Sequence, residues 1–293
     1  MITPEEREWF YRAVASSTSG AESDSKKIQD DVAIVRDAGA MDESAVQTAL
    51  EDLIDRCEQR DNAGDMLSIG GADALVGVVW EGRGRTRMLA ARALAVATQN
   101  HRDAQTRAAN AGAVQALLNV VRTDSDEVSL RSALWALSCI IRDCPEAAKA
   151  FEEAEGAKVV AQLIAKANPK GDLQNRTLAG ALNLGKHAFV QSERNMADAI
   201  EHDAIPGAVR GANSGNINVR EASAKLLLTI AKCVDFEKNP KAVDQFHDGA
   251  PILAQVHSYM GILNVSENAP IRKKLGKLLR MMGTFGTESP GAQ

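Results

Sequence analysis

The sequence predicts an all-α solenoid, because one helical unit recurs along the chain. Four apolar segments rich in small residues are each followed by a second apolar segment. The first segments span 71–79, 112–121, 156–164 and 204–212, and those that follow span 91–98, 132–139, 179–186 and 223–230. Aligned on Ala93, Ala133, Ala181 and Ala224, the units repeat at intervals of 40, 48 and 43 residues, which is the period of armadillo and HEAT repeats. No convincing strand-like alternation interrupts them.

We therefore expect a right-handed armadillo-repeat solenoid of about four repeats with capping helices. Such a stack presents one long concave surface, which usually binds another macromolecule. The formal net charge of −5 and the pI near 5.6 argue against general nucleic-acid binding, which favours a basic face. The four cysteines have no zinc-ligand spacing, and the chain begins with acidic and polar residues rather than a signal peptide. No apolar run reaches the length of a membrane span, so we expect no membrane contact. We also expect a cytoplasmic monomer that holds no cofactor or metal.

The N-terminal region is predicted to hold an arm and a cap. Residues 1–25 form an amphipathic arm with a short helix at 4–17, which carries Trp9 and Phe10, and a flexible polar linker at 17–25. Residues 26–59 form capping helices, with a confident helix from about Ser44.

The repeats are assigned to residues 60–236, followed by capping helices at 237–283 and a disordered tail at 284–293. In the second repeat, helices are expected at 101–111, 112–122 and 124–144. Asp124 or Ser125 would be the N-cap of the third helix, and Pro145 would end it and begin the next unit.

The third helix of each repeat lines the concave groove in this repeat type. Helical spacing turns Val128, Leu134, Leu137 and Ile141 toward the core, and leaves Arg131, Trp135, Ser138 and Arg142 together on the other face. Aligned positions for Trp135 are Ala95, Asn183 and Leu226. An exposed tryptophan flanked by arginines fits an interface anchor, and partial packing of the ring between repeats is the alternative. Lys186 joins this face by the same geometry.

Armadillo proteins that read extended peptides repeat tryptophan and asparagine four residues apart along the groove. Here Trp135 is followed by Cys139, and Asn183 by His187, so this ladder is absent and a folded partner is favoured. The sequence also lacks a P-loop, an HExxH motif and a GxSxG motif, and we expect no catalytic residues.

Three stretches resemble one family. They are RDNAGDMLSIGGADALV at 60–76, ATQNHRDAQTRAANAGAVQALLNVV at 97–121 and SALWALSCIIR at 132–142. Together they are similar to the armadillo-type nucleotide exchange factors of heat-shock protein 70, the heat-shock-protein-70-binding protein family. The N-terminal WFYRAVASS is also similar to the start of that family. The similarity is strong over about 45–165 and weaker to 190, and the fourth repeat and the C-terminal cap depart from it.

The resemblance implies a co-chaperone that binds the ATPase domain of heat-shock protein 70 and accelerates ADP release. Gln99, Asn100, Trp135, Arg142 and Asn183 match family positions for partner binding. Helical geometry adds Arg131 and Lys186, whereas Asn100 could instead serve to cap a helix junction. The resemblance assigns Trp9 and Phe10 to an arm that helps to free bound substrate. The rival hypotheses are a general scaffold for another folded protein and an enzyme with an unrecognised site.

Overall fold

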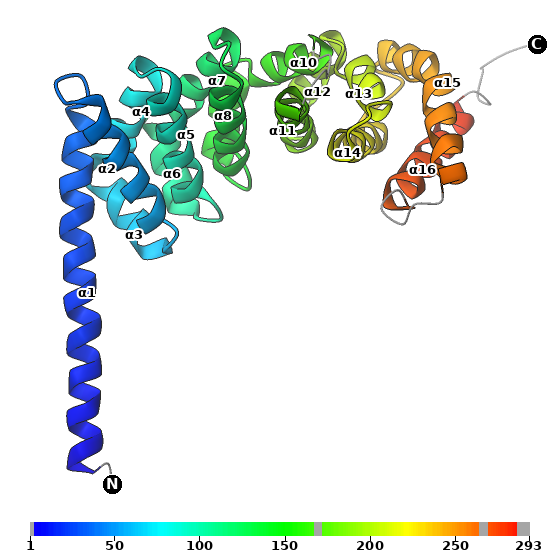
Figure 1. Ribbon diagram of the computed structural model, residues 1–293. Coiled ribbons are helices and arrows are strands. Elements are labelled where there is room, and N and C mark those ends of the chain that lie inside the picture. Colours follow the sequence, from blue (N-terminus) through cyan, green and yellow to red (C-terminus); the bar gives the residue numbers. More distant parts are fainter. Residues whose placement is uncertain (1–2, 167–171, 264–268, 286–293) are drawn as a thin grey trace, which may run out of the picture.

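The computed structural model is an arch of helices with one long helix projecting from its N-terminal end (Figure 1). It describes residues 3–166, 172–263 and 269–285. Within these ranges there is no strand. The N-terminal elements are α1 (Pro4–Arg36), α2 (Glu43–Arg56), α3 (Arg60–Met66), the short π-helix η1 (Leu67–Gly71), α4 (Ala72–Glu81), α5 (Gly84–Thr98), α6 (Arg102–Asn110), α7 (Ala113–Thr123) and α8 (Glu127–Ile140). The C-terminal elements are α9 (Pro145–Glu153), α10 (Gly156–Lys166), α11 (Asp172–Ala188), α12 (Glu193–Glu201), α13 (Ala204–Ala212), α14 (Ile217–Cys233), α15 (Pro240–Leu263) and α16 (Ala269–Phe285).

The predicted armadillo architecture is confirmed. Four three-helix repeats start at α3, α6, α9 and α12, with α1 and α2 before them and α15 and α16 after them. The helices α2, α5, α8, α11, α14 and α16 pack side by side as an inner row, and α4, α7, α10, α13 and α15 pack as a second row. In Figure 1 the labelled inner helices lie along the hollow side of the arch, which makes them the concave surface.

The turn between the first and second helix of each repeat has the same backbone device. One residue in each turn has a positive φ, and these residues are Gly70 (φ 90°), Gly112 (φ 84°), Glu155 (φ 54°) and Asp203 (φ 60°). Glycine adopts this left-handed region without strain, whereas other residues do so at a cost. Ala93, Ala133, Ala181 and Ala224, on which the units align, are all buried. Small side chains at these positions let neighbouring helices pack closely, so the repeat read from the sequence is a packing requirement.

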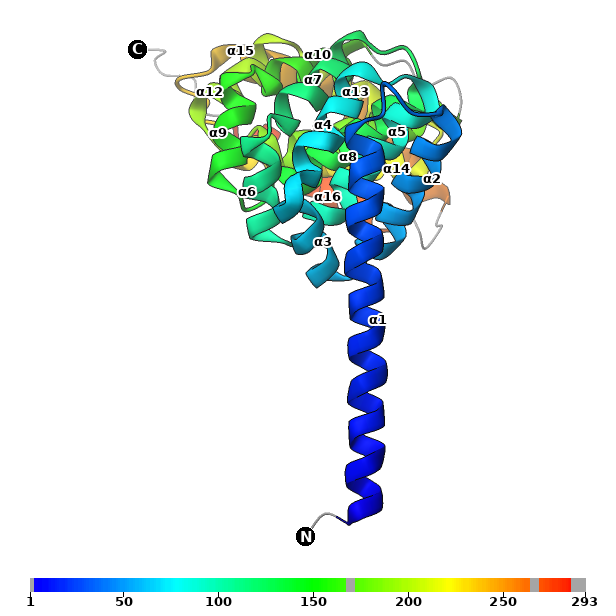
Figure 2. The same cartoon turned by 90° about the vertical axis from the view of Figure 1, so that its left-hand side faces the viewer.

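The predicted linker at 17–25 is wrong as secondary structure, because α1 runs through it to Arg36. The segment contains a single glycine and no proline, and interior Ser, Thr or Gly each costs a helix only about 1 kcal/mol or less. A capping box in which Thr3 and Glu6 exchange hydrogen bonds starts the helix. In the C-terminal part of α1, Asp24 accepts a hydrogen bond from Arg56 at 2.9 Å, and the side chains of Ile28 and Val32 are buried. Figure 2 shows the N-terminal half of α1 projecting beyond the arch.

The third helix of the second repeat starts and ends inside its predicted range of 124–144. Asp126 is the N-cap of α8 and accepts from the Ser129 amide at 2.9 Å. The Asp124 carboxylate instead accepts from the Asp126 amide and pairs with Arg87 at 2.6 Å, so it fixes the turn before the helix. Pro145 begins α9, as expected.

One stretch of the described chain, Arg60–Glu81, is long and apolar enough to cross a membrane, with a mean hydropathy of 1.2. The sequence-based expectation concerned uninterrupted apolar runs, and Asp65 and Asp73 interrupt this stretch. The stretch is bent at Gly70, and 56% of its apolar window is buried inside the protein. It consists of α3, η1 and α4 of the first repeat.

At the C-terminal end of the repeats, α15 packs on α13 and α16 packs on α14. Helix α16 extends to Phe285, two residues into the predicted tail. The rest of that tail lies outside the described residues.

Candidate functional site

The exposed positions of the inner row define the concave face. Leu134 and Leu137 on α8 and Ile141 directly after it are buried as predicted, whereas Val128 is only half-buried because it lies in the first turn. Trp135 remains 38% exposed, and Arg142 just after the helix is exposed. The face of α8 that was assigned to the groove is therefore the face that reaches solvent.

The alignment of Trp135 with the other repeats is wrong by one residue in two places. Ala95 and Leu226 are fully buried and cannot face the groove. Their neighbours Val96 and Lys225 are the partly exposed positions that correspond to Trp135 and Asn183. Alanine occupies several buried positions on each inner helix, so aligning on one alanine does not fix the register.

A hollow on the concave face, which we call the α5–α8 hollow, brings together four of the seven predicted partner-binding residues. These are Gln99, Asn100, Trp135 and Arg142, which the sequence places in two different repeats. The hollow has a volume of about 440 Å³, and its other lining residues are Arg102, Gln105, Ser138, Cys139 and Asp143. It therefore offers an aromatic ring beside amide and guanidinium donors.

Buried hydrogen bonds fix the shape of this hollow. Gln105 on α6 is buried, and its amide donates to the carbonyl oxygens of Cys139 and Arg142 at 2.8 and 3.0 Å. These carbonyls belong to the last turn of α8 and its exit, where no intrahelical donor is available. Asn100 has φ 55°, so it forms the turn after α5, as the capping alternative proposed, and also lines the hollow. Burial raises the pKa of the Cys139 thiol to about 11, so the thiol is neutral near pH 7.

A second hollow, the α11–α14 hollow, contains Asn183. It has a volume of about 520 Å³ and is predominantly polar. Its lining residues are Asn175, Arg176, Ala179, Gly180, Asn183, Asn216, Asn218, Glu221, Ala222 and Lys225. Arg176, Glu221 and Lys225 were not among the residues predicted from the sequence. An alignment of α14 with α11 that used the pattern of buried residues would have matched Lys225 with Asn183.

Charged side chains cluster beside the α11–α14 hollow. Glu221 pairs with Lys225 at 2.9 Å and with Lys274 of α16 at 3.3 Å. Hydrogen bonds from these ammonium groups hold the pKa of the Glu221 carboxyl below its usual value. The pKa of Lys186 is lowered, first by partial burial and then by the positive charges of Lys225, Arg142 and Lys274. Four positively charged side chains thus lie near one another on the concave face, namely Lys186 of α11, Lys225 of α14, Lys274 of α16 and Arg142 after α8.

Four predicted site residues lie outside both hollows: Lys186, which lies beside the second one, and Arg131, Trp9 and Phe10. Arg131 lies one turn before Trp135 on α8, is partly exposed and lines neither of them. Trp9 is 71% exposed near the start of α1, on the part that projects beyond the arch. Phe10 lies in the same turn of helix, and its side chain is outside the described residues.

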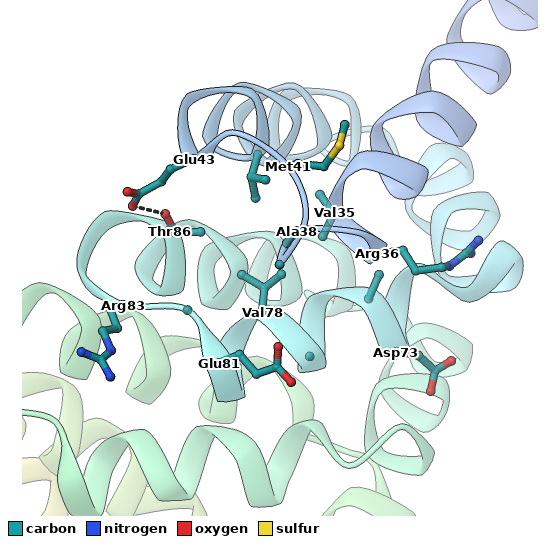
Figure 3. A pocket seen from close by; sticks show the side chains of 15 residues that line it. Val35, Arg36, Ala38, Met41, Glu43, Asp73, Val78, Glu81, Arg83 and Thr86 are labelled. Carbon is teal, nitrogen blue, oxygen red and sulfur yellow. Dashed lines mark hydrogen bonds between the residues drawn. The ribbon is translucent and has the colours of Figure 1, made fainter.

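A further hollow lies at the N-terminal edge, between the end of α1, the loop before α2, and α4 (Figure 3). Its volume is about 510 Å³. Val35, Val46 and Val78 contribute apolar lining, and Thr86 donates to Glu43 at 2.9 Å at its rim. No sequence pattern pointed to this hollow, because its lining comes from two stretches of the chain, 35–46 and 73–86, that only the fold brings together. Among the described residues, no group of three or more His, Cys, Asp or Glu side chains could hold a metal ion.

Comparison with known proteins gives a match over the repeat region. Residues 62–206 match the model of the SIL1/FES1/HPBP1 C-terminal domain. Hsp70-binding protein 1 of Rattus norvegicus is 27% identical over 169 residues, which cover 54% of this chain and 47% of that protein. The Hsp70 nucleotide exchange factor FES1 of Coccidioides immitis (strain RS) is 30% identical over 132 residues, covering 45% of this chain and 62% of that protein. The chain thus spans about half the length of the first of these relatives.

Among solved structures, a designed armadillo repeat protein in complex with the peptide (KR)4 superimposes with a TM-score of 0.68. The match covers 86% of this chain and 98% of the designed protein, at 17% sequence identity. This similarity concerns the fold alone. All residues that line the α5–α8 hollow, from the first and the second repeat, lie within the range 62–206 that matches the family model.

Proposed function

We propose that this chain, which belongs through residues 62–206 to the SIL1/FES1/HPBP1 C-terminal domain family, is a nucleotide exchange factor. In this proposal its concave surface binds the ATPase domain of a heat-shock-protein-70 chaperone and accelerates release of ADP. The names of the relatives support the function, since they include Hsp70-binding protein 1 and an Hsp70 nucleotide exchange factor.

The α5–α8 hollow is the observation that carries the proposal. It lies within the matched range and unites Gln99, Asn100, Trp135 and Arg142 in one concave site. A tryptophan or arginine at the centre of an interface often supplies most of its binding energy. Because the amides do not form a ladder along the inner row, the surface suits a folded domain better than an extended peptide. Asn183 in the second hollow and Lys186 beside it extend the same face.

The mechanism is a shift in population between two states of the chaperone. A factor that binds the open, nucleotide-weak state better than the closed state favours opening in proportion to that difference in affinity. Linkage requires bound ADP to weaken factor binding by the same ratio. The chain itself supplies binding energy and steric bulk, and no bond is made or broken by its own side chains.

Stopped-flow release of a fluorescent ADP analogue from the chaperone tests this function. We expect the rate of ADP release to rise with the concentration of this protein, while the protein alone hydrolyses no ATP. An unchanged rate at saturating protein would contradict the proposal. Retention of the chaperone from a cell extract without such acceleration would instead support the scaffold hypothesis.

Helix α1 supplies the proposed substrate-release arm. Trp9 lies on its projecting half and is available to solvent, and Phe10 is adjacent in the same helix. In this proposal the arm contacts the peptide-binding part of the same chaperone while the repeats hold the ATPase domain. A cytoplasmic location and a monomeric state remain predictions of the sequence.

A further inference from the structure

Beside the α11–α14 hollow, the ion pairs of the described residues leave positive charge on the concave face without a carboxylate partner. Lys225 and Lys274 share the single Glu221 carboxylate, at 2.9 and 3.3 Å. Lys186 forms no ion pair with any residue that the structure describes, although it is only partly exposed. The charges that lower its pKa all come from cations, namely Lys225, Arg142 and Lys274. This arrangement is unfavourable in the isolated protein and would be relieved by an added anion.

The neighbouring groups do not supply that anion. His187 lies next to Lys186 and has a lowered pKa, because of partial burial and the positive charges of Lys186 and Arg142. The carboxylate of Asp143 raises the pKa of His187, but it has no such effect on the pKa of Lys186. Glu221 is already bound to two ammonium groups.

The adjoining α11–α14 hollow supplies the hydrogen-bond donors that an anion needs. Asn183, Asn218 and Arg176 line it together with Lys225. Amide, guanidinium and ammonium groups that converge on one concave region are typical of sites for carboxylates or phosphates. The net charge of −5 for the whole chain disfavours a nucleic-acid polymer, because the overall field repels a long chain of phosphates.

We propose that the α11–α14 hollow and Lys186 form a binding site for a cluster of Asp and Glu side chains on the surface of the folded partner. The identity of that partner as a chaperone ATPase domain rests on the proposed function. The site is distinct from the α5–α8 hollow, because it recognises charge rather than an apolar or aromatic surface. Complementary charges at an interface mainly raise the association rate and fix orientation.

Charge reversal at Lys186 tests the proposal against a matched control. Lys186→Glu should lower the association rate constant with the purified ATPase domain about tenfold at low ionic strength, and the effect should shrink as salt is added. Lys149→Glu makes the same change in net charge on α9, outside the inner row, where Lys149 is 78% exposed. It should leave the rate constant unchanged. Lys186→Gln should lower the association rate constant by an intermediate factor. If Lys186→Glu fails to fold, an association rate constant of Lys186→Gln equal to that of the wild type would contradict the proposal.

Two probes separate failure of this inference from failure of the proposed function. If the wild-type protein does not bind the ATPase domain, the function is wrong, and titration with a fluorescent hexaglutamate peptide then tests the site alone. The peptide should bind the wild type more tightly than Lys186→Glu. Equal binding to both, or tighter binding of an oligothymidylate of equal charge, would overturn the inference. If the ATPase domain binds Lys186→Glu and Lys149→Glu equally fast, the function stands and the acidic site is refuted.

Discussion

The two hollows of the concave face differ in the chemistry that they offer. The α5–α8 hollow has the exposed Trp135 ring beside Gln99, Asn100 and Arg142, and Gln105 fixes its base. The α11–α14 hollow has no aromatic residue among its lining side chains and is formed by asparagines and charged groups. Both lie on the same inner row of helices, in repeats of the same architecture.

This difference shows how one repeat scaffold can separate two properties of binding. Burial of an aromatic ring acts at short range and mainly slows dissociation, whereas charge acts over about 10 Å at ordinary salt and mainly speeds association. We therefore expect substitutions in the two hollows to change different rate constants.

The double variant Trp135→Ala with Arg142→Glu should weaken chaperone binding most. Loss of a central aromatic residue commonly costs about 2 kcal/mol or more, or about thirty-fold in Kd, and the charge reversal adds a salt-sensitive loss. Calorimetry measures the affinity, and far-UV circular dichroism checks that the helices remain. Trp80→Ala is the matched control, because Trp80 is 46% exposed on α4 in the second row. Wild-type affinity in the folded double variant would place the interface elsewhere.

Substitution of Gln105 should damage the α5–α8 hollow through stability. Gln105→Ala leaves the carbonyls of Cys139 and Arg142 without their side-chain donor, so the free energy of unfolding should fall by about 1–3 kcal/mol. Urea denaturation measures the change. Gln115→Ala on the exposed face of α7 is the control and should fall within about 0.5 kcal/mol of wild type. Equal stability of the two variants would show that water replaces the lost amide.

Kinetics at several salt concentrations should separate the two hollows directly. Trp135→Ala alone should raise the dissociation rate constant at every ionic strength, whereas Lys225→Gln should lower the association rate constant several-fold at low salt only. Surface-immobilised ATPase domain gives both constants. A change of the same rate constant with the same salt dependence in both variants would contradict the division of roles.

Removal of residues 1–22 should have the smallest effect on binding and stability. Among the described side chains of α1, Ile28 is the first that is buried, and the ion pair between Asp24 and Arg56 is retained in this truncation. The melting temperature and the ADP release rate should stay close to those of the full chain. Release of a tightly held peptide from the chaperone should slow if Trp9 acts there. A drop of many degrees in the melting temperature would instead show that the projecting half stabilises the stack.

The sequence by itself determined the repeat, the inner row and the outward face of α8. Periodic placement of buried alanines and leucines is a local property, and the identity of Trp135 and Arg142 as surface residues follows from helical spacing. The caps at Pro145 and Gly112 were also readable, because proline and glycine restrict or permit backbone angles in a way that does not depend on neighbours.

Only the tertiary structure decided which residues of different repeats meet. The one-residue shifts at Val96 and Lys225 depend on how each inner helix rotates to fit its neighbours, and several alanines per helix made the register ambiguous in sequence. The continuous α1 depends on anchoring of Asp24 and Ile28 against later helices. The sharing of Glu221 by Lys225 and Lys274 joins residues from two helices that only packing brings together. Local propensity fixes each helix and its faces, whereas the concave site is formed by distances between helices, which packing alone sets.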